Sequence, residues 1–433
     1  MRDSFLQAIK TTETVRRTGR IIQFFGLAVE SQGPDVFLGE VCEISSPASV
    51  RPVLAEVVGF RGGNVLLMPC GSIAGVHVGS EVIATGRPAS VAVGGALIGR
   101  VLDGFGKPID GKGDVETEQR YAIHPEPINP LAREKIDAVL ETGILTIDGL
   151  LSLGKGQRVG IFAGSGVGKS TLLGQIAKRV NVDMNVIALI GERGREVLEF
   201  IDQILGKEGL KKSVVVVASA DQPALVRTHA AYTAMTIAEY FRDQGRDVLL
   251  TMDSLTRYAM AQREIGLAVG EPPTSRGYTP STFEKIPRLV ERAGNFAGKG
   301  SITALFTVLV EGDDFNEPVS DHARAILDGH IVLTRKLANI GVFPAIDLLQ
   351  STSRLKRSVL TDDEFRLSGQ ALQNLGRFET LRDSIELGLY RKGENAQSDK
   401  IIAFESSFGE FRMQKDSEEN SRQTVFRWLG DHL

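Results

Sequence analysis

The sequence is poor in cysteine, in histidine and in long apolar runs, and each shortage excludes a class of protein. Only Cys42 and Cys70 occur among 433 residues, with no Cys-x-x-Cys pair, which excludes a disulfide framework and a typical zinc site. The six histidines show no metal-ligand spacing. No apolar run approaches the roughly 18–20 residues of a membrane span, and residues 1–18 lack the apolar centre of a secretory signal. A reducing cytosol is therefore the expected compartment.

An excess of positive charge is also absent. Acidic residues number 54 and basic residues 50, giving a formal net charge of −4. Because proteins that bind nucleic acid usually carry a basic excess or stripe, nucleic acid is not expected as a partner. A hydrophobic content of 42% and a charged content of 24% are typical of a globular protein. The length exceeds that of one ordinary core and predicts two or three domains.

The pattern of residues changes along the chain and predicts four regions. Residues 1–18 are expected to form an arm, either a frayed terminus or a docking segment. Residues 19–90 hold short apolar runs separated by glycine and proline, which is typical of a small β-barrel. Residues 91–357 begin with a turn-rich connector near residues 98–110 and then alternate apolar runs with helices, which predicts an α/β domain with a parallel sheet. Residues 358–433 are expected to form a helical domain.

The most specific motif lies at residues 158–171. An apolar strand is expected to end at Ala163, which stands where the first glycine of this motif is usual, and a helix is expected from Lys169. Strand, glycine-rich turn and helix together are the context of a P-loop, whose amides and helix dipole bind phosphate. Lys169 is expected to reach the β- and γ-phosphates, and the Ser170 hydroxyl to bind Mg²⁺. The residues expected to bind the nucleotide here are Gly164, Ser165, Gly166, Val167, Gly168, Lys169, Ser170 and Thr171.

Two carboxylates follow apolar runs later in the chain. Asp253 ends the run 248–253, a Walker B arrangement, and we expect this strand beside the P-loop strand with Asp253 holding Mg²⁺ through water. Glu192 follows the run 186–190 and is the candidate to activate the attacking water. Arg193 is expected to hold either the γ-phosphate or Glu192. The alternative is a solvated charge cluster at the start of the next helix, and these residues alone do not decide between the two.

A second long signature covers residues 343–354, where Arg354 is expected in a Ser/Thr-rich turn after a strand-like run. An arginine presented to a γ-phosphate from a neighbouring subunit neutralises charge in the transition state and contributes about 10³–10⁵ in rate. Taken alone, an arginine paired with a nearby carboxylate is the more ordinary interpretation.

Together these motifs resemble the rotary ATPase superfamily of ATP synthase α/β subunits. The resemblance rests on the P-loop, on Gly-Glu-Arg-Gly-Arg-Glu at 191–196, on Walker B and on Pro-Ala-Ile-Asp-Leu-Leu-Gln-Ser-Thr-Ser at 344–353. Residues 254–266 and 270–281 are similar to the flagellar and type III secretion ATPases. The resemblance spans nearly the whole chain and implies a RecA-like P-loop core after a small β-barrel and before an α-helical domain.

The resemblance also implies ATP and Mg²⁺ as cofactors and assigns roles residue by residue. Phe343 falls where the family stacks an aromatic ring on adenine, and Tyr390 where a second aromatic ring closes that pocket. The remaining matches are Lys169 and Ser170 at the phosphate and Mg²⁺ positions, Glu192 as catalytic carboxylate, Asp253 as Walker B and Arg354 as an arginine finger lent to a neighbouring subunit.

The partners implied are further copies in a homohexamer, stator and central-stalk proteins of an export apparatus, export substrates and their chaperones, and an export gate at the inner membrane. The expected location is the cytoplasmic face of that membrane. Residues 271–278 match a segment that faces the pore of the ring. The P-loop and residues 255–258 favour the flagellar branch over the virulence branch, and both stay open.

Three other functions compete with protein export. The catalytic subunit of a rotary ATP synthase is opposed by the absence of the acidic stretch Asp-Glu-Leu-Ser-Glu-Glu-Asp. A non-hydrolysing ring subunit is opposed by the set of P-loop, Walker B and finger residues. A hexameric RNA translocase should carry stacking aromatics on its barrel. Here the barrel aromatics sit in apolar runs and are expected in its core; they are Phe24, Phe25, Phe37 and Phe60.

Overall fold

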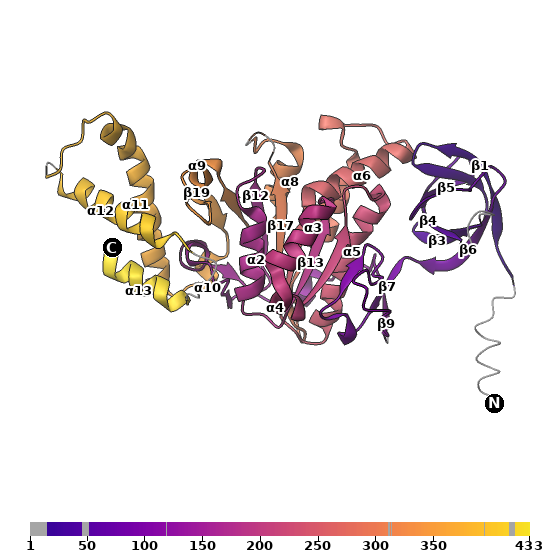
Figure 1. The fold of residues 1–433 in the computed structure, drawn as a ribbon, viewed down its shortest axis with the longest axis horizontal. Coiled ribbons are helices and arrows are strands. Elements are labelled where there is room, and N and C mark those ends of the chain that lie inside the picture. Colours follow the sequence, from indigo (N-terminus) through magenta and orange to yellow (C-terminus); the bar gives the residue numbers. More distant parts are fainter. Residues whose placement is uncertain are drawn as a thin grey trace.

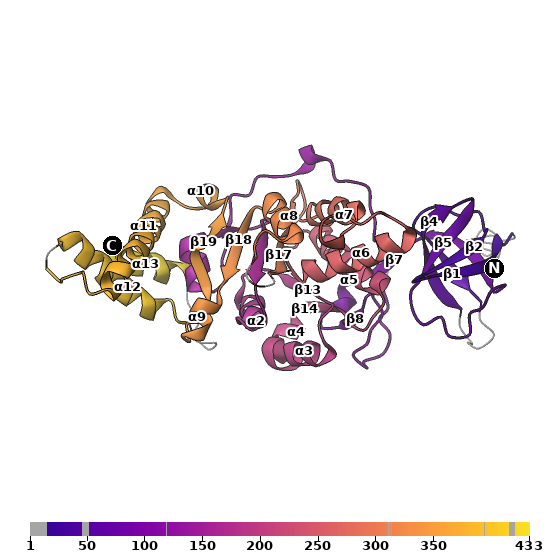
Figure 2. The same cartoon turned by 90° about the horizontal axis from the view of Figure 1, so that it is seen from above.

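The computed structural model of the chain describes residues 15–45, 52–117, 119–310, 312, 314–393, 395–414 and 421–433. Three parts lie in a row, with a β-barrel at one end, an α/β sheet in the middle and a group of helices at the other end (Figures 1 and 2). This arrangement confirms the expected fold class. Most of the predicted N-terminal arm lies outside the described residues.

The barrel closes in the strand order β1-β2-β5-β4-β3-β6. Its strands are β1 (Thr18–Phe25), β2 (Ala28–Gln32), β3 (Glu40–Ile44), β4 (Val53–Arg61), β5 (Asn64–Pro69) and β6 (Glu81–Pro88). Alternate side chains, among them Ile21, Val29 and Leu67, fill the interior. Sequence analysis missed β2 because Glu30 and Ser31 interrupt its apolar pattern, although both are buried in the structure.

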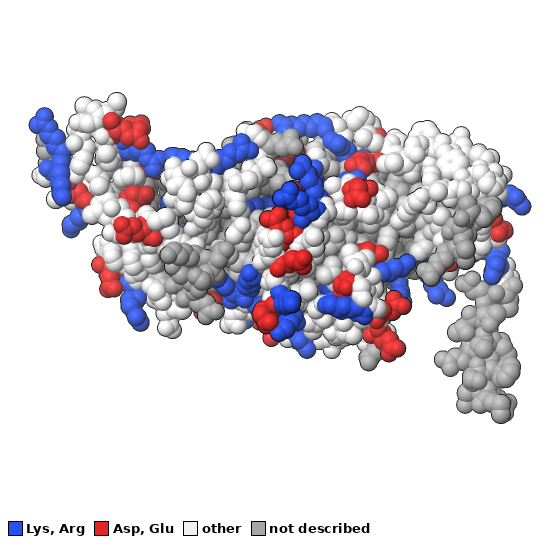
Figure 3. Space-filling model, viewed as in Figure 1, with Lys and Arg blue, Asp and Glu red and all other residues white. Residues whose placement is uncertain are grey.

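The placement of the barrel aromatics was predicted wrongly. Phe24, Phe25, Phe37 and Phe60 were expected in the core, but they are 40%, 43%, 45% and 54% exposed. An apolar run in a small barrel has an outer face as well as an inner one, so half of its side chains point away from the interior. The visible face of the barrel carries few charged side chains (Figure 3). Because these rings are exposed, their position no longer argues against the RNA translocase alternative.

The central sheet has nine strands, eight of them in the order β19-β18-β12-β17-β15-β13-β14-β8. These strands are β8 (Val101–Asp103), β12 (Arg158–Ala163), β13 (Met184–Ile190), β14 (Ser213–Ala218), β15 (Val248–Asp253), β17 (Ser301–Leu309), β18 (Gly329–Leu333) and β19 (Ile346–Ser353). Neighbours in this order pair in parallel except β19, which is antiparallel to β18. The ninth strand, β16 (Gly294–Asn295), pairs antiparallel with β17.

Two sequence expectations about the sheet are corrected. The Walker B strand β15 does not lie beside the P-loop strand β12, because β17 lies between them and pairs with both. The segment predicted as a connector contains β8, an edge strand parallel to β14. Both errors concern strand order, which depends on crossovers between distant parts of the chain rather than on local pattern.

Helices cover both faces of the sheet. One face packs against α5 (Ala224–Asp243), α6 (Leu255–Val269), α7 (Pro280–Val290) and α8 (Pro318–Ile326). The other face packs against α2 (Lys169–Arg179) and the π-helix Phe200–Leu205. The C-terminal helices α11 (Asp362–Glu386), α12 (Ala396–Phe411) and α13 (Arg422–His432) lie beyond the edge strand β19, and α11 contacts that strand (Figure 1). Shorter helices are α3 (Gly194–Glu199), α4 (Gly206–Lys211), α9 (Arg335–Asn339) and α10 (Lys356–Val359). In the described part of the chain, no helix is both long and apolar enough to cross a membrane.

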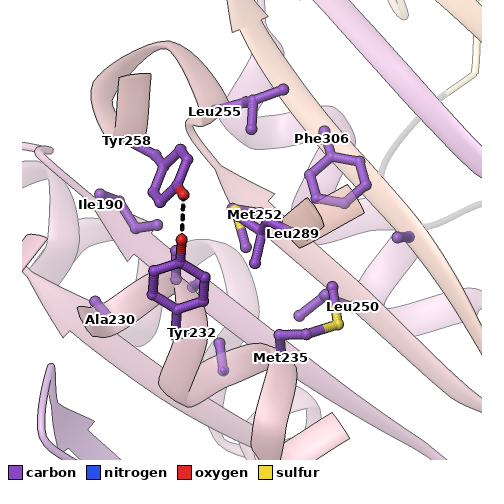
Figure 4. Packing of buried hydrophobic residues seen from close by; sticks show 14 of the residues in the cluster. Ile190, Ala230, Tyr232, Met235, Leu250, Met252, Leu255, Tyr258, Leu289 and Phe306 are labelled. Atoms are coloured by element: carbon purple, nitrogen blue, oxygen red, sulfur yellow. Dashed lines mark hydrogen bonds between the residues drawn. The ribbon is translucent and has the colours of Figure 1, made fainter. Parts of the chain in front are cut away.

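A buried tyrosine pair fixes the helix that leaves the Walker B strand. Tyr232 of α5 and Tyr258 of α6 meet edge to face, and their hydroxyl oxygens are 2.6 Å apart (Figure 4). Leu255 and Met252 pack around this pair within the same apolar cluster. Because α6 begins two residues after Asp253, this packing sets the direction of the chain as it leaves the site.

Candidate nucleotide site

The P-loop forms at the carboxyl end of β12, as its sequence predicts. Residues 164–168 turn from the strand into α2, which begins at Lys169. Gly166 and Gly168 have φ angles of 79° and 86°, a region that favours glycine. Ala163 is instead the last residue of the strand and is not among the residues with positive φ. This explains why alanine is tolerated where the motif usually has its first glycine.

Lys169 lies between the two predicted carboxylates. Its Nζ is 2.6 Å from Oδ1 of Asp253 and 3.4 Å from Oε1 of Glu192. Burial alone would lower the pKa of Lys169, but the two carboxylates outweigh it and the pKa is raised. The ammonium group therefore stays charged in this cluster, ready to bind an anion such as phosphate.

Glu192 has the character expected of a base. It follows Gly191, whose φ of 71° turns the chain at the end of β13. Burial raises the pKa of Glu192 to about 7, and the charge of Asp253 adds to this while Lys169 opposes it. A carboxylate that titrates near neutral pH can accept a proton from water and release it again.

Oxygen donors suited to Mg²⁺ are present at the same edge of the sheet. Ser170 is the second residue of α2, and the Asp253 side chain is only 3% exposed. Oδ1 of Asp253 also accepts a hydrogen bond from Oγ1 of Thr307 at 2.6 Å. A hydroxyl and one carboxylate, together with phosphate and water oxygens, are the ligands that P-loop proteins give Mg²⁺, so the residues fit the metal.

Phe343 lies at the opening of the P-loop. A Cβ atom built on Gly168 would be 3.3 Å from Cδ1 and Cε1 of its ring, so the ring rests against the last glycine of the loop. The Phe343 side chain is 45% exposed. An aromatic ring that touches the P-loop and still has a free face can stack on a nucleotide base.

Tyr390 is not brought to Phe343. Its hydroxyl donates to Oδ1 of Asp399 on α12, and this hydrogen bond raises the pKa of Tyr390 to about 12. Within the described residues, no ring contact joins Tyr390 to Phe343. The sequence-based role of Tyr390 in closing the base pocket stays a prediction.

The two predicted arginines both lie on the surface. The Arg193 side chain is 83% exposed and pairs with Glu196 at 3.7 Å, not with Glu192. Arg354 is exposed, and its guanidinium donates to the backbone carbonyl of Arg324 at 3.0 Å. Over the described residues, no carboxylate pairs with Arg354, which removes the ordinary interpretation of this arginine as an ion-pair partner.

The strand register places Arg354 far from the P-loop of its own chain. Val159 at the start of β12 is level with Gly329, and Gly329 is level with Ser353 at the end of β19. The P-loop follows the other end of β12, about 16 Å away at roughly 3.3 Å per residue. Arg354 and Lys169 are therefore at opposite ends of the strands of the sheet.

Two polar residues of the site were missed by sequence analysis. Arg257, in the first turn of α6, lies against Gly191, where an added Cβ would be 2.9 Å from its own Cβ. Its Nε is buried without a hydrogen-bond partner in the described structure. Its position four residues after Asp253 could have signalled it. Thr307 sits in the middle of an apolar run and gives no such signal.

Comparison with known proteins agrees with this geometry. Residues 143–353 match the nucleotide-binding domain of the ATP synthase alpha/beta family, residues 21–86 match its beta-barrel domain, and residues 360–431 match the T3SS EscN ATPase C-terminal domain. The chain is 50% identical to the flagellum-specific ATP synthase of Bacillus subtilis over 96% of its own length and 95% of that protein.

Solved structures give the same result. The assembled ATPase EscN from the enteropathogenic E. coli type III secretion system superposes with a TM-score of 0.90 at 43% identity, covering 95% of this chain and 99% of EscN. A second structure, of assembled EscN in complex with its central stalk EscO, superposes with a TM-score of 0.88 at 42% identity and the same coverage. The chain therefore belongs to the ATP synthase alpha/beta family and, within it, to the ATPases of flagellar and type III secretion systems.

Proposed function

We propose that this chain hydrolyses ATP as a ring of identical subunits, six by family resemblance, and that turnover energises protein export, most closely of the flagellar kind. The observation that supports the ring is the distance between Arg354 and Lys169 across the sheet. An arginine finger must reach the γ-phosphate, so Arg354 can serve only the P-loop of a neighbour. Head-to-tail contacts of this kind close into a ring by rotation.

Within one site the residues divide the work. The amides of residues 164–168 and the start of α2 bind the phosphates, and Lys169 moves from its carboxylates to the phosphate oxygens. Glu192 orients the attacking water and accepts its proton. Ser170 and Asp253 would hold Mg²⁺, which supplies charge neutralisation at the phosphates when bound. Phe343 stacks on adenine, and the exposed Arg193 is available to the γ-phosphate.

The partners follow from relatives of known assembly. EscN has been seen assembled and with its central stalk EscO, so we propose self-assembly and a stalk protein for this chain. Stator proteins, export substrates with their chaperones and the export gate complete the proposal, at the cytoplasmic face of the inner membrane and without nucleic acid. Three flagellum-specific relatives are 50% identical to this chain, against 47% for the type 3 secretion system ATPase of Xanthomonas euvesicatoria, a small margin toward the flagellar branch.

The ring mechanism is tested by diluting the protein. Specific ATPase activity should rise with protein concentration and change most steeply where sedimentation shows assembly, because a lone subunit lacks the neighbour's arginine. Activity per subunit that stays flat down to a monomer would refute the shared site. Restoration of motility by the chain in a strain that lacks its flagellar ATPase, but not of type III effector secretion in a matching strain, would support the flagellar assignment.

A further inference from the structure

Thr307 stands out because it is a fully buried polar side chain in direct contact with the Walker B carboxylate. It is 0% exposed, and its Oγ1 donates to Oδ1 of Asp253 at 2.6 Å. Thr307 belongs to β17, the strand that lies between the P-loop strand and the Walker B strand. The register pairs Met252 with Phe306, so Asp253 and Thr307 are level at the carboxyl edge of the sheet.

Asp253 Oδ1 accepts hydrogen bonds from two donors, of which only one is expected to stay in place when ATP binds. Lys169 contributes one hydrogen bond and Thr307 the other, both at 2.6 Å. When ATP binds, Lys169 is expected to turn to the phosphates. Asp253 would then lose its flexible partner, and a buried carboxylate that lacks hydrogen bonds is costly. Thr307 cannot leave in the same way, because a β-branched side chain on a central strand has little rotamer freedom.

The strand that carries Thr307 is itself tied to the site. The backbone N–H of Leu309, two residues further on, donates to Oγ1 of Thr256 at 2.9 Å. Thr256 is in the first turn of α6, directly after Walker B. The end of β17 and the start of α6 are thus held together, which keeps the Thr307 hydroxyl in line with Asp253.

We propose that Thr307 is a positioning residue, which holds the Asp253 carboxylate in the orientation needed for Mg²⁺ while Lys169 serves the phosphates. This inference rests on the proposed role of Asp253 in Mg²⁺ binding. It differs from a packing role for Thr307, because packing needs the shape of the side chain and not its hydroxyl.

The test replaces the hydroxyl and keeps the shape. Thr307→Val should lower kcat about tenfold or more, the effect of losing one hydrogen bond to a charged group. It should also raise the Mg²⁺ concentration needed for tight ATP binding, while ATP binding in EDTA stays at the parental value. Thr307→Ser restores a hydroxyl and should recover most of both properties.

The neighbouring strand offers a matched control. Thr251 of β15 is 1% exposed, and its hydroxyl has no hydrogen-bond partner in the described structure. Thr251→Val therefore makes the same chemical change at equal burial and should leave the Mg²⁺ requirement and kcat as in the parent. If Thr251→Val lowers kcat and raises the Mg²⁺ requirement as much as Thr307→Val does, then Thr307 acts through packing and the proposal fails.

Two further outcomes separate this inference from the proposed function. If Asp253→Asn keeps the parental Mg²⁺ requirement, the proposed metal role of Asp253 is wrong. If Asp253→Asn needs more Mg²⁺ than the parent for tight ATP binding but folded Thr307→Val does not, Asp253 keeps its role and only the positioning role of Thr307 is refuted. Circular dichroism and thermal unfolding establish that each variant is folded.

Discussion

Lys169 and Arg354 lie at opposite ends of the strands of one sheet, although both belong to the same reaction in the proposed mechanism. Strand β19 connects the two ends, since Phe343 before it touches the P-loop and Arg354 after it lies level with the start of β12. In the proposed mechanism, this strand places the base-binding ring at one end and the arginine finger at the other. Strand β19 therefore separates Phe343 from Arg354 by about 16 Å or more.

Replacing Glu192 should separate binding from turnover. Glu192→Gln keeps the size of the side chain but cannot accept a proton, so we expect nearly parental ATP affinity and a loss of most of kcat. Lys169→Ala removes a charge that meets the phosphates in the ground state and should weaken both. Nucleotide titration and single-turnover hydrolysis measure the two effects. Near-normal hydrolysis by Glu192→Gln would remove this residue from its role.

The pH dependence should report Glu192 directly. Burial and the charge of Asp253 raise its pKa to about 7, and the base works only when it is ionised. The value of kcat/KM should therefore rise with pH through a midpoint near 7, since this ratio reports the free enzyme. A nearby carboxylate, Glu196, also raises the pKa of Glu192, so Glu196→Gln should move the midpoint to lower pH. An unchanged midpoint in this variant would assign the titration to another group.

Phe343 should contribute to affinity rather than to rate. We expect Phe343→Ala to weaken ATP binding by about 1–3 kcal/mol, the size of a base-stacking contact, with kcat at saturation largely retained. Phe343→Tyr keeps an aromatic face and serves as the control. Equilibrium titration with a fluorescent ATP analogue measures the change. Parental affinity in the alanine variant would place the base elsewhere.

The local features of the site were predictable from sequence, and the relations between distant segments were not. The P-loop and Glu192 each follow an apolar strand and Asp253 ends one, and a strand followed by a turn is encoded within about ten residues. The position of β17 between β12 and β15 is set by crossovers far along the chain. Thr307 could not be recognised for this reason, since only that strand order brings its hydroxyl to Asp253.

Surface and interior were harder to separate in the barrel. Phe24 and Phe60 lie in apolar runs, and a run gives no sign of which side chains face outward in a small closed sheet. Glu30 shows the converse. It is only 3% exposed, yet its charge interrupts the apolar pattern by which its strand could have been recognised in the sequence. In both cases the deciding factor is the closure of the barrel, which is a property of six strands together.

A buried contact between a carboxyl group and an imidazole joins the barrel to the nucleotide domain and should make stability depend on pH. Oε2 of Glu56 on β4 is 2.6 Å from Nε2 of His229 on α5. Burial would raise the pKa of Glu56, but His229 outweighs it and the pKa is lowered. A lowered pKa in the folded state stabilises the protein above the unfolded value of about 4.3, and this stabilisation is lost as the pH falls through the folded value.

Glu56→Gln should therefore destabilise the protein by about 1–3 kcal/mol near pH 7, the cost of losing a buried hydrogen bond to a charged group. The difference from the parent should shrink below about pH 4.3, where the unfolded carboxyl is protonated. Denaturant unfolding at several pH values measures it. The exposed pair Lys211–Glu208 offers a control, and Glu208→Gln should have little effect. If the loss in the free energy of unfolding caused by Glu56→Gln is the same at every pH, the proposed link between stability and the ionisation of Glu56 is wrong.

The decisive prediction concerns the use of Arg354 in trans. Arg354→Ala leaves the P-loop of its own subunit intact, and Lys169→Ala leaves its own arginine intact, so each variant alone should form an inactive ring. When the two are mixed and allowed to reassemble, some interfaces combine the P-loop of the first variant with the arginine of the second. Random assembly of equal amounts makes about one interface in four complete in this way, and ATPase activity should return accordingly.

The mixing experiment separates the shared site from the alternatives because only the interface changes. If Arg354 acted on its own P-loop, no combination of these subunits would contain a complete site, and the mixture would stay as inactive as its parents while sedimentation still showed rings. A double variant carrying both substitutions, mixed with either single variant, is the matched control and should restore nothing. Activity that returns with the two single variants but not with the double variant can arise only when one subunit supplies Lys169 and its neighbour supplies Arg354.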